Sequence, residues 1–345
     1  MTHAVFAIPG DKDRRTGGFI YEARVLDELN GMGCATQHLQ LPASFPDPTP
    51  ADMAATVRAL CAVPRDRPII LDGLVFGAID PAGLAQVQAP VIAMVHHPLG
   101  LETGLPPDRA AYLMANERAA LRHTAHVIVP SPETARVLRD DFAADPARIT
   151  IAPPGFDRPE VDRQPADPPL ILSVGLLAPR KGHDVLLNAL AQLTDLPWQA
   201  EIVGKTYDAA YAARLRAHAS PRVTFAGELS AAQLNARFNA ASVFALATRY
   251  EGYGMVLSEA MIFGLPVVSC AVGAVPATVG DAAALVPPDD ADALAATLRR
   301  ILTDGTEAQR LSRLSHQKAD SLPSWQDTAR HFVDVVAAVR ASVDP

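Results

Sequence analysis

The chain has 345 residues, of which 49% are hydrophobic and 20% are charged, and its formal net charge is −8. That length suits two α/β domains of ordinary size, and the composition is typical of globular proteins with a large core. The acidic balance argues against a nucleic-acid partner and offers little attraction to anionic lipid. Neither a signal peptide nor a membrane-spanning run is visible, and three widely spaced cysteines form no disulfide or metal-ligand pattern, so we expect a cytoplasmic protein.

Apolar runs alternate with helical patterns along the first half of the chain. They predict strands over residues 4–8, 36–41, 68–71, 91–95, 127–129 and 149–152, and helices over 18–29, 109–123 and 132–141. The runs lack a strict alternation of apolar and polar residues, which is typical of parallel strands covered on both faces. Strands that alternate with helices indicate βαβ units.

Residues 153–169 interrupt this alternation with a proline-rich stretch that predicts an interdomain linker. The alternation then resumes, with strands predicted over 170–174, 199–203, 223–226, 243–247, 266–269 and 283–286, and helices near 183–193, 209–217, 231–239, 256–264, 291–302 and 325–341. We therefore predict two doubly wound, Rossmann-like α/β domains, 1–165 and 166–324, that face a cleft. A last helix, about 325–345, is expected to pack back on the first domain. Ligands of such sheets bind beyond the carboxyl ends of the strands.

Two glutamates stand out in residues 248–268, which read TRYEGYGMVLSEAMIFGLPVV. Glu251 and Glu259 are separated by seven residues, and between them a glycine-containing turn leads into a helix near Met255. The free amides at such a helix start favour an anion, and the glycines let the backbone approach a ligand closely. A carboxylate one turn along the helix is a natural acceptor for the vicinal hydroxyls of a sugar or ribose.

With Tyr253 in place of the usual Phe, this segment resembles the signature of family 4 of the retaining nucleotide-sugar glycosyltransferases, E-G-F-G…E-A-M…G-x-P-V-V. The resemblance covers nearly the whole chain and includes residues 149–157, 223–246 and 273–294. It implies the GT-B fold, with the acceptor on the first domain and the nucleotide-diphosphate sugar on the second. It also implies that Glu251 lies beside the donor sugar, that Glu259 binds the ribose, and that the backbone of Tyr253, Gly254 and Met255 meets the sugar and phosphates.

A lysine follows the first strand of the second domain, within SVGLLAPRKGHDVLL (173–187). Lys181 opens a helix after a strand, where an ammonium group attracts a diphosphate. The resemblance implies this role as well, but the family's usual arginine five positions earlier is Leu176 here. The neighbouring Arg180 is therefore a candidate for the second cation. We assign no role to Ala277, where many relatives carry Glu.

The first domain offers a glycine pair and a histidine pair. Gly17 and Gly18 precede the first helix, where relatives have a double glycine that faces the donor phosphates; Arg14 and Arg15 lie just before them. His96 and His97 follow the fourth strand, and the resemblance implies that His96 lies beside the donor sugar. Ser131 is interpreted as a helix cap, without a role in the site.

Apolar residues occupy the loop HHPLGLETGL (96–105), where we expect the acceptor to bind. Leu99, Leu101 and Leu105 either pack on neighbouring helices or, with His97, form an apolar acceptor pocket or a lip that touches the inner face of a membrane. The acceptor is then a lipid such as diacylglycerol, or alternatively a soluble saccharide or small metabolite.

The resemblance implies a retaining hexosyltransferase that works by front-face substitution, with no cofactor beyond its sugar-nucleotide co-substrate. No cluster of acidic residues suggests a divalent metal site. A nucleotide-sugar epimerase, which shares this two-domain fold, is the alternative from another enzyme class. A non-catalytic binding protein is a third, supported only by Leu176. The E-G-Y-G context and the presence of Lys181 favour the transferase.

Overall fold

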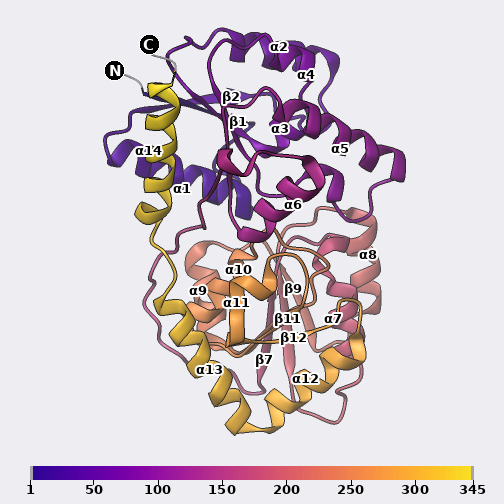
Figure 1. Cartoon of the computed structure of the whole chain (residues 1–345). Coiled ribbons are helices and arrows are strands. Elements are labelled where there is room, and N and C mark those ends of the chain that lie inside the picture. Colours follow the sequence, from indigo (N-terminus) through magenta and orange to yellow (C-terminus); the bar gives the residue numbers. More distant parts are fainter. Residues whose placement is uncertain (1–2, 343–345) are drawn as a thin grey trace. The chain divides into compact units, whose positions relative to one another are not determined.

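The computed structural model describes residues 3–342 and consists of two compact units (Figure 1). The first unit contains the chain up to Phe156 together with the residues from Pro323 onward, and the second contains Asp157–Leu322. Each unit is built on a six-stranded sheet in which neighbouring strands pair in parallel. The two doubly wound α/β folds predicted from the alternation of strands and helices are therefore confirmed.

The sheet of the first unit has the strand order β2-β1-β3-β4-β5-β6. Its helices lie in the connections between strands, as parallel pairing requires. The elements are β1 (Ala4–Pro9), α1 (Gly17–Gly31), β2 (Thr36–Leu41), α2 (Pro50–Cys61), β3 (Ile69–Asp72), α3 (Gly73–Ala78), α4 (Pro81–Leu84), β4 (Val91–Met94), η1 (Leu99–Leu101), α5 (Pro107–Leu121), β5 (His126–Val129), α6 (Pro132–Phe142), η2 (Pro146–Arg148), β6 (Ile149–Ile151) and the C-terminal α14 (Trp325–Ala341).

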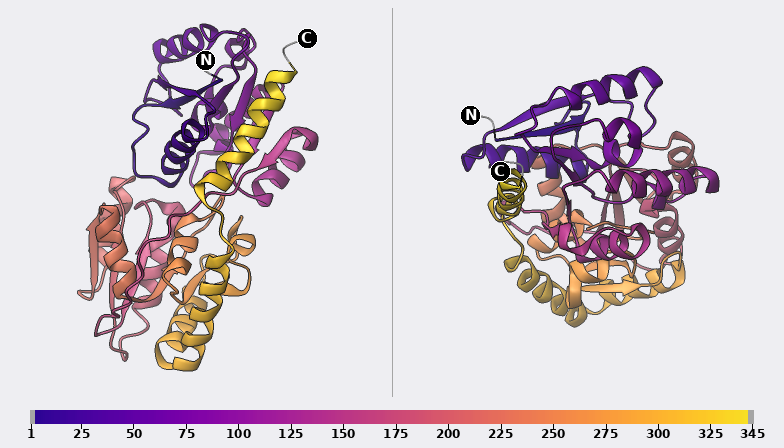
Figure 2. Two further views of the ribbon diagram at one scale, coloured as in Figure 1. Left: turned by 90° about the vertical axis from the view of Figure 1, so that its left-hand side faces the viewer. Right: turned by 45° about the horizontal axis from the view of Figure 1, so that its top comes forward.

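The C-terminal helix α14, yellow in Figures 1 and 2, belongs to the first unit. It packs on α1 through aromatic rings: Tyr21 meets Trp325 at 5.9 Å and Phe332 at 6.1 Å between ring centroids. The backbone passes Gly155 so closely that a Cβ there would lie 2.3 Å from the Trp325 amide nitrogen. A glycine is therefore required at position 155, where the chain that follows β6 meets the start of α14.

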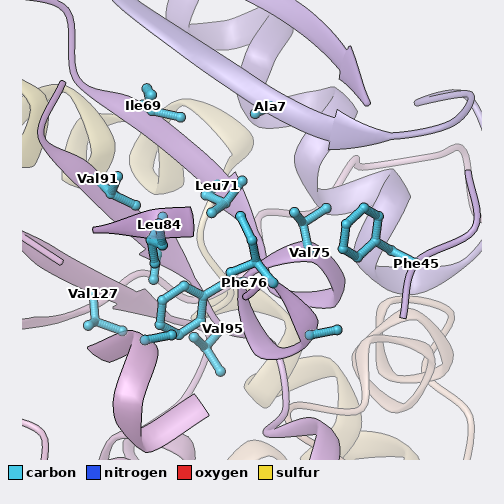
Figure 3. Packing of buried hydrophobic residues seen from close by; sticks show 14 of the residues in the cluster. Ala7, Phe45, Ile69, Leu71, Val75, Phe76, Leu84, Val91, Val95 and Val127 are labelled. Atoms are coloured by element: carbon cyan, nitrogen blue, oxygen red, sulfur yellow. The ribbon is translucent and has the colours of Figure 1, made fainter. Parts of the chain in front are cut away.

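One face of the first sheet is covered by a core that Figure 3 shows from close by. Val75 and Phe76 of α3 pack against the side chains of β3, including Leu71, and all three residues are fully buried. Fully burying a side chain of this kind contributes about 1.5–3 kcal/mol. This core fixes the carboxyl ends of β3 and β4, where His96 lies.

The sheet of the second unit has the order β12-β11-β10-β7-β8-β9, which places β7 and β10 side by side at its centre. Its elements are β7 (Leu170–Val174), η3 (Pro179–Lys181), α7 (His183–Leu190), β8 (Gln199–Val203), α8 (Ala209–His218), β9 (Val223–Gly227), α9 (Ala231–Ala240), β10 (Ala241–Leu246), α10 (Met255–Ile262), β11 (Val267–Cys270), α11 (Val275–Val279), η4 (Gly280–Ala282), β12 (Ala283–Val286), α12 (Ala291–Thr303) and α13 (Gly305–Asp320). None of the helices in the described part of the chain is long and apolar enough to cross a membrane.

The division between the units falls nine residues before the predicted boundary at 165/166. The intervening segment lies along the second unit because its polar groups are satisfied there. Arg163 donates hydrogen bonds to the carbonyl oxygens of Phe238 (2.7 Å) and Ala241 (2.6 Å), and Gln164 N–H donates to Asn239 O (3.1 Å).

Candidate functional site

The candidate donor site lies at the carboxyl ends of β7 and β10 in the second unit. These strands are parallel neighbours, so the loops that leave them, 175–182 and 247–254, start from the same edge of the sheet. Parallel sheets of this kind bind their ligands at this edge. The loops carry Lys181 and Glu251, and the structure brings these two residues together.

Glu251 is buried, and its carboxylate is held by two cations and a hydroxyl. Lys181 Nζ donates to Oε1 at 2.6 Å, and Thr248 Oγ1 lies 2.9 Å from the same oxygen. Arg180 reaches the other side of the carboxylate, with NH1 3.5 Å from Oε2. Burial opposes ionisation of Glu251, but the two cations and the hydrogen bonds outweigh it and lower its pKa. The group is therefore ionised, and the cluster carries one net positive charge.

Arg180 is directed into the site. Besides its contact with Glu251, it donates a hydrogen bond from NH1 to Tyr250 O at 2.9 Å. Leu176, where the family resemblance predicts an arginine, instead offers its carbonyl oxygen to His183 Nε2 at 3.2 Å. Arg180 thus supplies the second cation of the cluster in the absence of an arginine at position 176.

Two glycines allow Lys181 to reach Glu251. Gly182 follows with φ +63°, and a Cβ there would lie 1.8 Å from Ala247 O at the end of β10. The side chain of Lys181 passes over Gly175, where a Cβ would lie 3.2 Å from its methylene carbons. Glycine is therefore needed at position 182 both for its backbone conformation and for the close approach of the two loops.

The turn after Glu251 opens helix α10 as the sequence predicts. Gly254 has φ +87° and precedes the first residue of the helix, Met255. The Leu257 amide donates to Gly254 O at 2.9 Å, so the amides of Met255 and Val256 come before this bond, at the exposed end of the helix dipole. Glu259 lies on the second turn of α10, partly buried. Burial, reinforced by Asp157, raises the pKa of Glu259 to about 7 although Lys181 opposes the shift. Hydrogen bonds from hydroxyl groups would stabilise the ionised form of the Glu259 carboxyl group.

The sequence interpretation missed two residues that hold this site in place. Thr248 bonds Glu251 directly. Arg249 lies beside it and ties the loops together, donating to Asp184 at 2.8 Å, to Asp289 at 2.7 Å and to Pro179 O. The available signal was position: Thr248 and Arg249 come directly after a buried strand, where site residues of parallel sheets gather.

A second group of predicted residues comes together in the first unit. Gly17 and Gly18 form the first turn of α1, and a Cβ on Gly18 would lie 3.4 Å from Cδ2 of His96. The backbone at Gly18 therefore lies close to the edge of the His96 imidazole ring. Nε2 of His96 lies 3.3 Å from Oε1 of Glu22, a buried acid that the sequence interpretation did not single out.

The apolar residues of loop 96–105 pack inward. Leu99, Leu101 and Leu105 all pack against the core of the first unit. The Leu99 side chain fills the space at Gly77, where a Cβ would lie 2.7 Å from Cδ1, and its amide donates to the buried Glu117 at 3.2 Å. Of the two interpretations left open for these leucines, the structure therefore favours packing on neighbouring elements.

The remaining predictions for the first unit concern His97, Arg14 and Ser131. His97 Nε2 lies 3.9 Å from Glu102 Oε2. The guanidinium of Arg14 lies over the Phe19 ring at 5.0 Å. Ser131 accepts a hydrogen bond from the Thr134 amide at 3.1 Å, so its interpretation as a helix cap is confirmed.

Sequence comparison assigns both units to glycosyltransferases. Residues 46–159 match the family described as "Glycosyltransferase Family 4", and residues 157–318 match "Glycosyl transferases group 1". The MMP α-(1→4)-mannosyltransferase of Mycolicibacterium hassiacum is 28% identical over 325 residues, which cover 87% of this chain and 77% of that protein. The D-inositol 3-phosphate glycosyltransferase of Nocardioides sp. is 30% identical over 70% of this chain, which spans only 60% of that relative's length.

Solved structures show the same fold. The sucrose-phosphate synthase of Thermosynechococcus elongatus superposes with a TM-score of 0.81 at 22% identity, over 98% of this chain and all of that one. Anabaena HepE in complex with UDP-glucose gives a TM-score of 0.76 at 16% identity, over 97% of this chain and 99% of the other. The chain is a glycosyltransferase and belongs to family 4, with the GT-B fold.

Proposed function

We propose that this enzyme transfers a hexose from a nucleotide-diphosphate sugar to an acceptor hydroxyl with retention of the anomeric configuration. The observation that carries the proposal is the pairing of Lys181 and Arg180 with Glu251 at the carboxyl edge of the second sheet. A diphosphate is an anion that two cations and the N-terminus of a helix bind well. Relatives named as a mannosyltransferase and an inositol phosphate glycosyltransferase, and the UDP-glucose complex of HepE, support a sugar-nucleotide donor.

The proposed reaction breaks the bond between the anomeric carbon and the diphosphate oxygen and forms a bond from that carbon to the acceptor oxygen on the same face. The acceptor proton passes to the departing diphosphate. Negative charge develops on the leaving oxygen, where Lys181 and Arg180 stabilise it, and positive charge develops on the sugar, where Glu251 lies. Preorganised charges of this kind typically dominate catalysis.

Proton NMR of the first product, before any anomerisation, tests this proposal. We expect an α-linked donor sugar to yield an α-linked product. A β-linked product would contradict the retaining assignment, and release of an epimerised donor in the absence of acceptor would indicate the epimerase.

For the acceptor we favour a soluble saccharide or small polyol over diacylglycerol. Leu99, Leu101 and Leu105 are partly buried against the core, which supports a structural role for them over an apolar lip for a lipid acceptor. We expect wild type to glycosylate soluble polyols or sugars and to remain in the supernatant with neutral and anionic vesicles. Transfer to diacylglycerol, together with co-sedimentation that Leu101→Ser abolishes in a protein with unchanged circular dichroism, would contradict this assignment and support the lipid.

We further propose that transfer requires no divalent metal, because Lys181 and Arg180 supply the positive charge beside the diphosphate that a metal would otherwise supply. Initial rates in excess EDTA are expected to stay within about twofold of those without the chelator, a difference below about 0.5 kcal/mol in the barrier. A loss of activity that Mg²⁺ or Mn²⁺ restores would show that a metal shares this role.

Glu259 is proposed to accept hydrogen bonds from the donor ribose. Glu259→Ala removes that acceptor, so we expect donor affinity to fall by about 1.5–3 kcal/mol, roughly ten- to hundredfold. Glu259→Gln keeps an acceptor oxygen and should weaken binding less. Calorimetric titration with the nucleotide sugar measures both; unchanged affinity in both variants would refute the ribose assignment.

Donor affinity is also expected to rise with pH. The pKa of Glu259 is about 7 without ligand, and hydroxyl donors favour the ionised form, so binding releases a proton below that pH. Affinity should increase up to about tenfold between pH 6 and pH 8. The phosphates of a nucleotide sugar do not titrate in this range, so Glu259→Gln should flatten the profile; an equally steep profile in that variant would assign the effect to another group.

A further inference from the structure

Two buried acids lie beside His96 in the first unit. Glu22 on α1 is fully buried, and Asp72, the last residue of β3, is 3% exposed. Strand β4 runs beside β3 with Met94 opposite Asp72, so the chain that continues to His96 leaves the sheet next to Asp72. In this position, Nε2 of His96 lies within hydrogen-bond distance of Glu22 Oε1, at 3.3 Å.

The Asp72 side chain accepts hydrogen bonds from backbone amides of the helix that follows it. Its Oδ1 accepts the amides of Leu74 (2.8 Å) and Val75 (3.2 Å) at the start of α3. The carboxyl groups of Asp72 and Glu22 also interact, which raises the pKa of Asp72 and lowers that of Glu22, so Asp72 holds its proton more firmly than Glu22 does. Within the described chain, Oε2 of Glu22 has no protein partner of normal hydrogen-bond geometry. In that part of the chain, the strong protein partners of the Glu22 carboxyl are thus Asp72 and the imidazole.

Burial makes all three groups neutral near pH 7. It raises the pKa of Glu22 to about 8, raises that of Asp72 well above its ordinary value, and lowers that of His96 to about 4. The neighbouring Tyr21 donates its hydroxyl to Ala152 O, and Glu22 contributes to raising the pKa of that hydroxyl. Helix α14 packs its Trp325 and Phe332 rings on Tyr21. Among the described residues, burial and Asp72 are the causes of the shift in the pKa of Glu22, and no cation contributes to it.

We propose that Glu22 sets the tautomer of His96. A protonated Glu22 donates its O–H to Nε2, so the imidazole proton must lie on Nδ1; an ionised Glu22 accepts Nε2–H, which leaves Nδ1 as an acceptor. The His96 side chain is 25% exposed, so a ligand can reach the ring. Near neutral pH the ring therefore presents an N–H donor, suited to a hydroxyl or phosphate oxygen of the substrate. Glu22 is a positioning residue, and the use of this donor in transfer rests on the proposed function.

Histidine ¹⁵N NMR of the full chain tests the proposal without relying on activity, with the His96 signals assigned from their loss in His96→Gln. We expect wild-type His96 to carry its proton on Nδ1 at pH 6.5 and on Nε2 at pH 9. In Glu22→Leu the ring should hold the Nε2–H form, which free imidazole side chains prefer, at both pH values. In Glu22→Gln the tautomer should not change with pH. Glu28→Gln, a matched change on the same helix, should keep the wild-type switch.

An Nε2–H tautomer in wild type at pH 6.5 would overturn the proposal, as would a pH switch that survives in a folded Glu22→Gln protein. Initial rates provide the second readout. We expect wild-type kcat to fall several-fold between pH 7 and pH 9, while donor KM changes by no more than the roughly twofold expected from Glu259, and Glu22→Gln to lack that fall in kcat. If the tautomer switches with pH in this way while no transfer to any acceptor is found, the proposed function fails and the assignment of Glu22 stands.

Discussion

Lys181→Ala is expected to lower kcat/KM by about 100- to 1000-fold. Removal of one preorganised group that stabilises developing charge typically costs about 2.7–4 kcal/mol in the barrier. Lys181 has the shorter contact with Glu251, 2.6 Å against 3.5 Å for Arg180, and the more buried side chain, 12% exposed against 22%. Its charge therefore acts in a less polar environment, where it interacts more strongly with an anion.

The matched variant is Arg180→Ala, for which we expect a loss of about tenfold, near 1.4 kcal/mol. Initial rates at saturating acceptor measure both, with thermal unfolding as the check that each variant folds. If Arg180→Ala proves the more damaging change, then Arg180, and not Lys181, is the principal diphosphate ligand.

Gly182→Ala is expected to destabilise the second unit severely and to abolish activity. The residue has φ +63°, a conformation that costs an alanine roughly 1–2 kcal/mol. In addition, the new Cβ would lie 1.8 Å from Ala247 O, a backbone atom that cannot rotate away. The loop must therefore move, and with it Lys181, whose ammonium group depends on this position to reach Glu251.

Gly227→Ala separates the two effects. Gly227 has a similar φ of +70°, but nothing lies within 4 Å of a Cβ built there. We expect the free energy of unfolding of this control to fall only by the conformational cost, roughly 1–2 kcal/mol, and its activity to be kept. Urea unfolding and initial rates compare Gly182→Ala with Gly227→Ala. Equal destabilisation of the two variants would mean that a Cβ at position 182 does not clash with Ala247 O.

Prediction from the sequence succeeded where a segment carries its own pattern. The strands of both sheets are short apolar runs, and Thr36–Leu41, Leu170–Val174, Gln199–Val203 and Ala283–Val286 have the predicted bounds. Helices α2 and α13 were not predicted, and each has a polar residue on its buried face. Helix α2 buries Thr56 and Leu60, and α13 buries Leu311, Ser315 and Ala319. Ser315 is accommodated through a hydrogen bond to Leu265 O, which only the fold reveals.

The candidate site shows the same distinction. Lys181 and Glu251 were singled out because they follow strand ends, and Glu259 because of its spacing from Glu251 in the motif; their roles stay predictions. Glu22 and Asp72 lie in ordinary helix and strand sequence, about fifty residues apart, and become notable only because folding buries them beside His96. Leu99 illustrates the converse: a leucine in a loop indicates either packing or a ligand, and the space at Gly77 that it fills cannot be inferred from the sequence.

The central claim is that the second unit binds a nucleotide-diphosphate sugar through Lys181, Glu251 and Glu259. Thermal unfolding of the full chain with a panel of UDP-, GDP- and ADP-sugars tests it most directly, because a ligand at about 100 times its Kd stabilises the folded state by about 2.7 kcal/mol. We predict that at least one of these donors raises Tm by several degrees, that the matching nucleoside monophosphate does so far less, and that Lys181→Ala largely removes the shift. No shift with any donor, or an undiminished shift in Lys181→Ala, would contradict this claim.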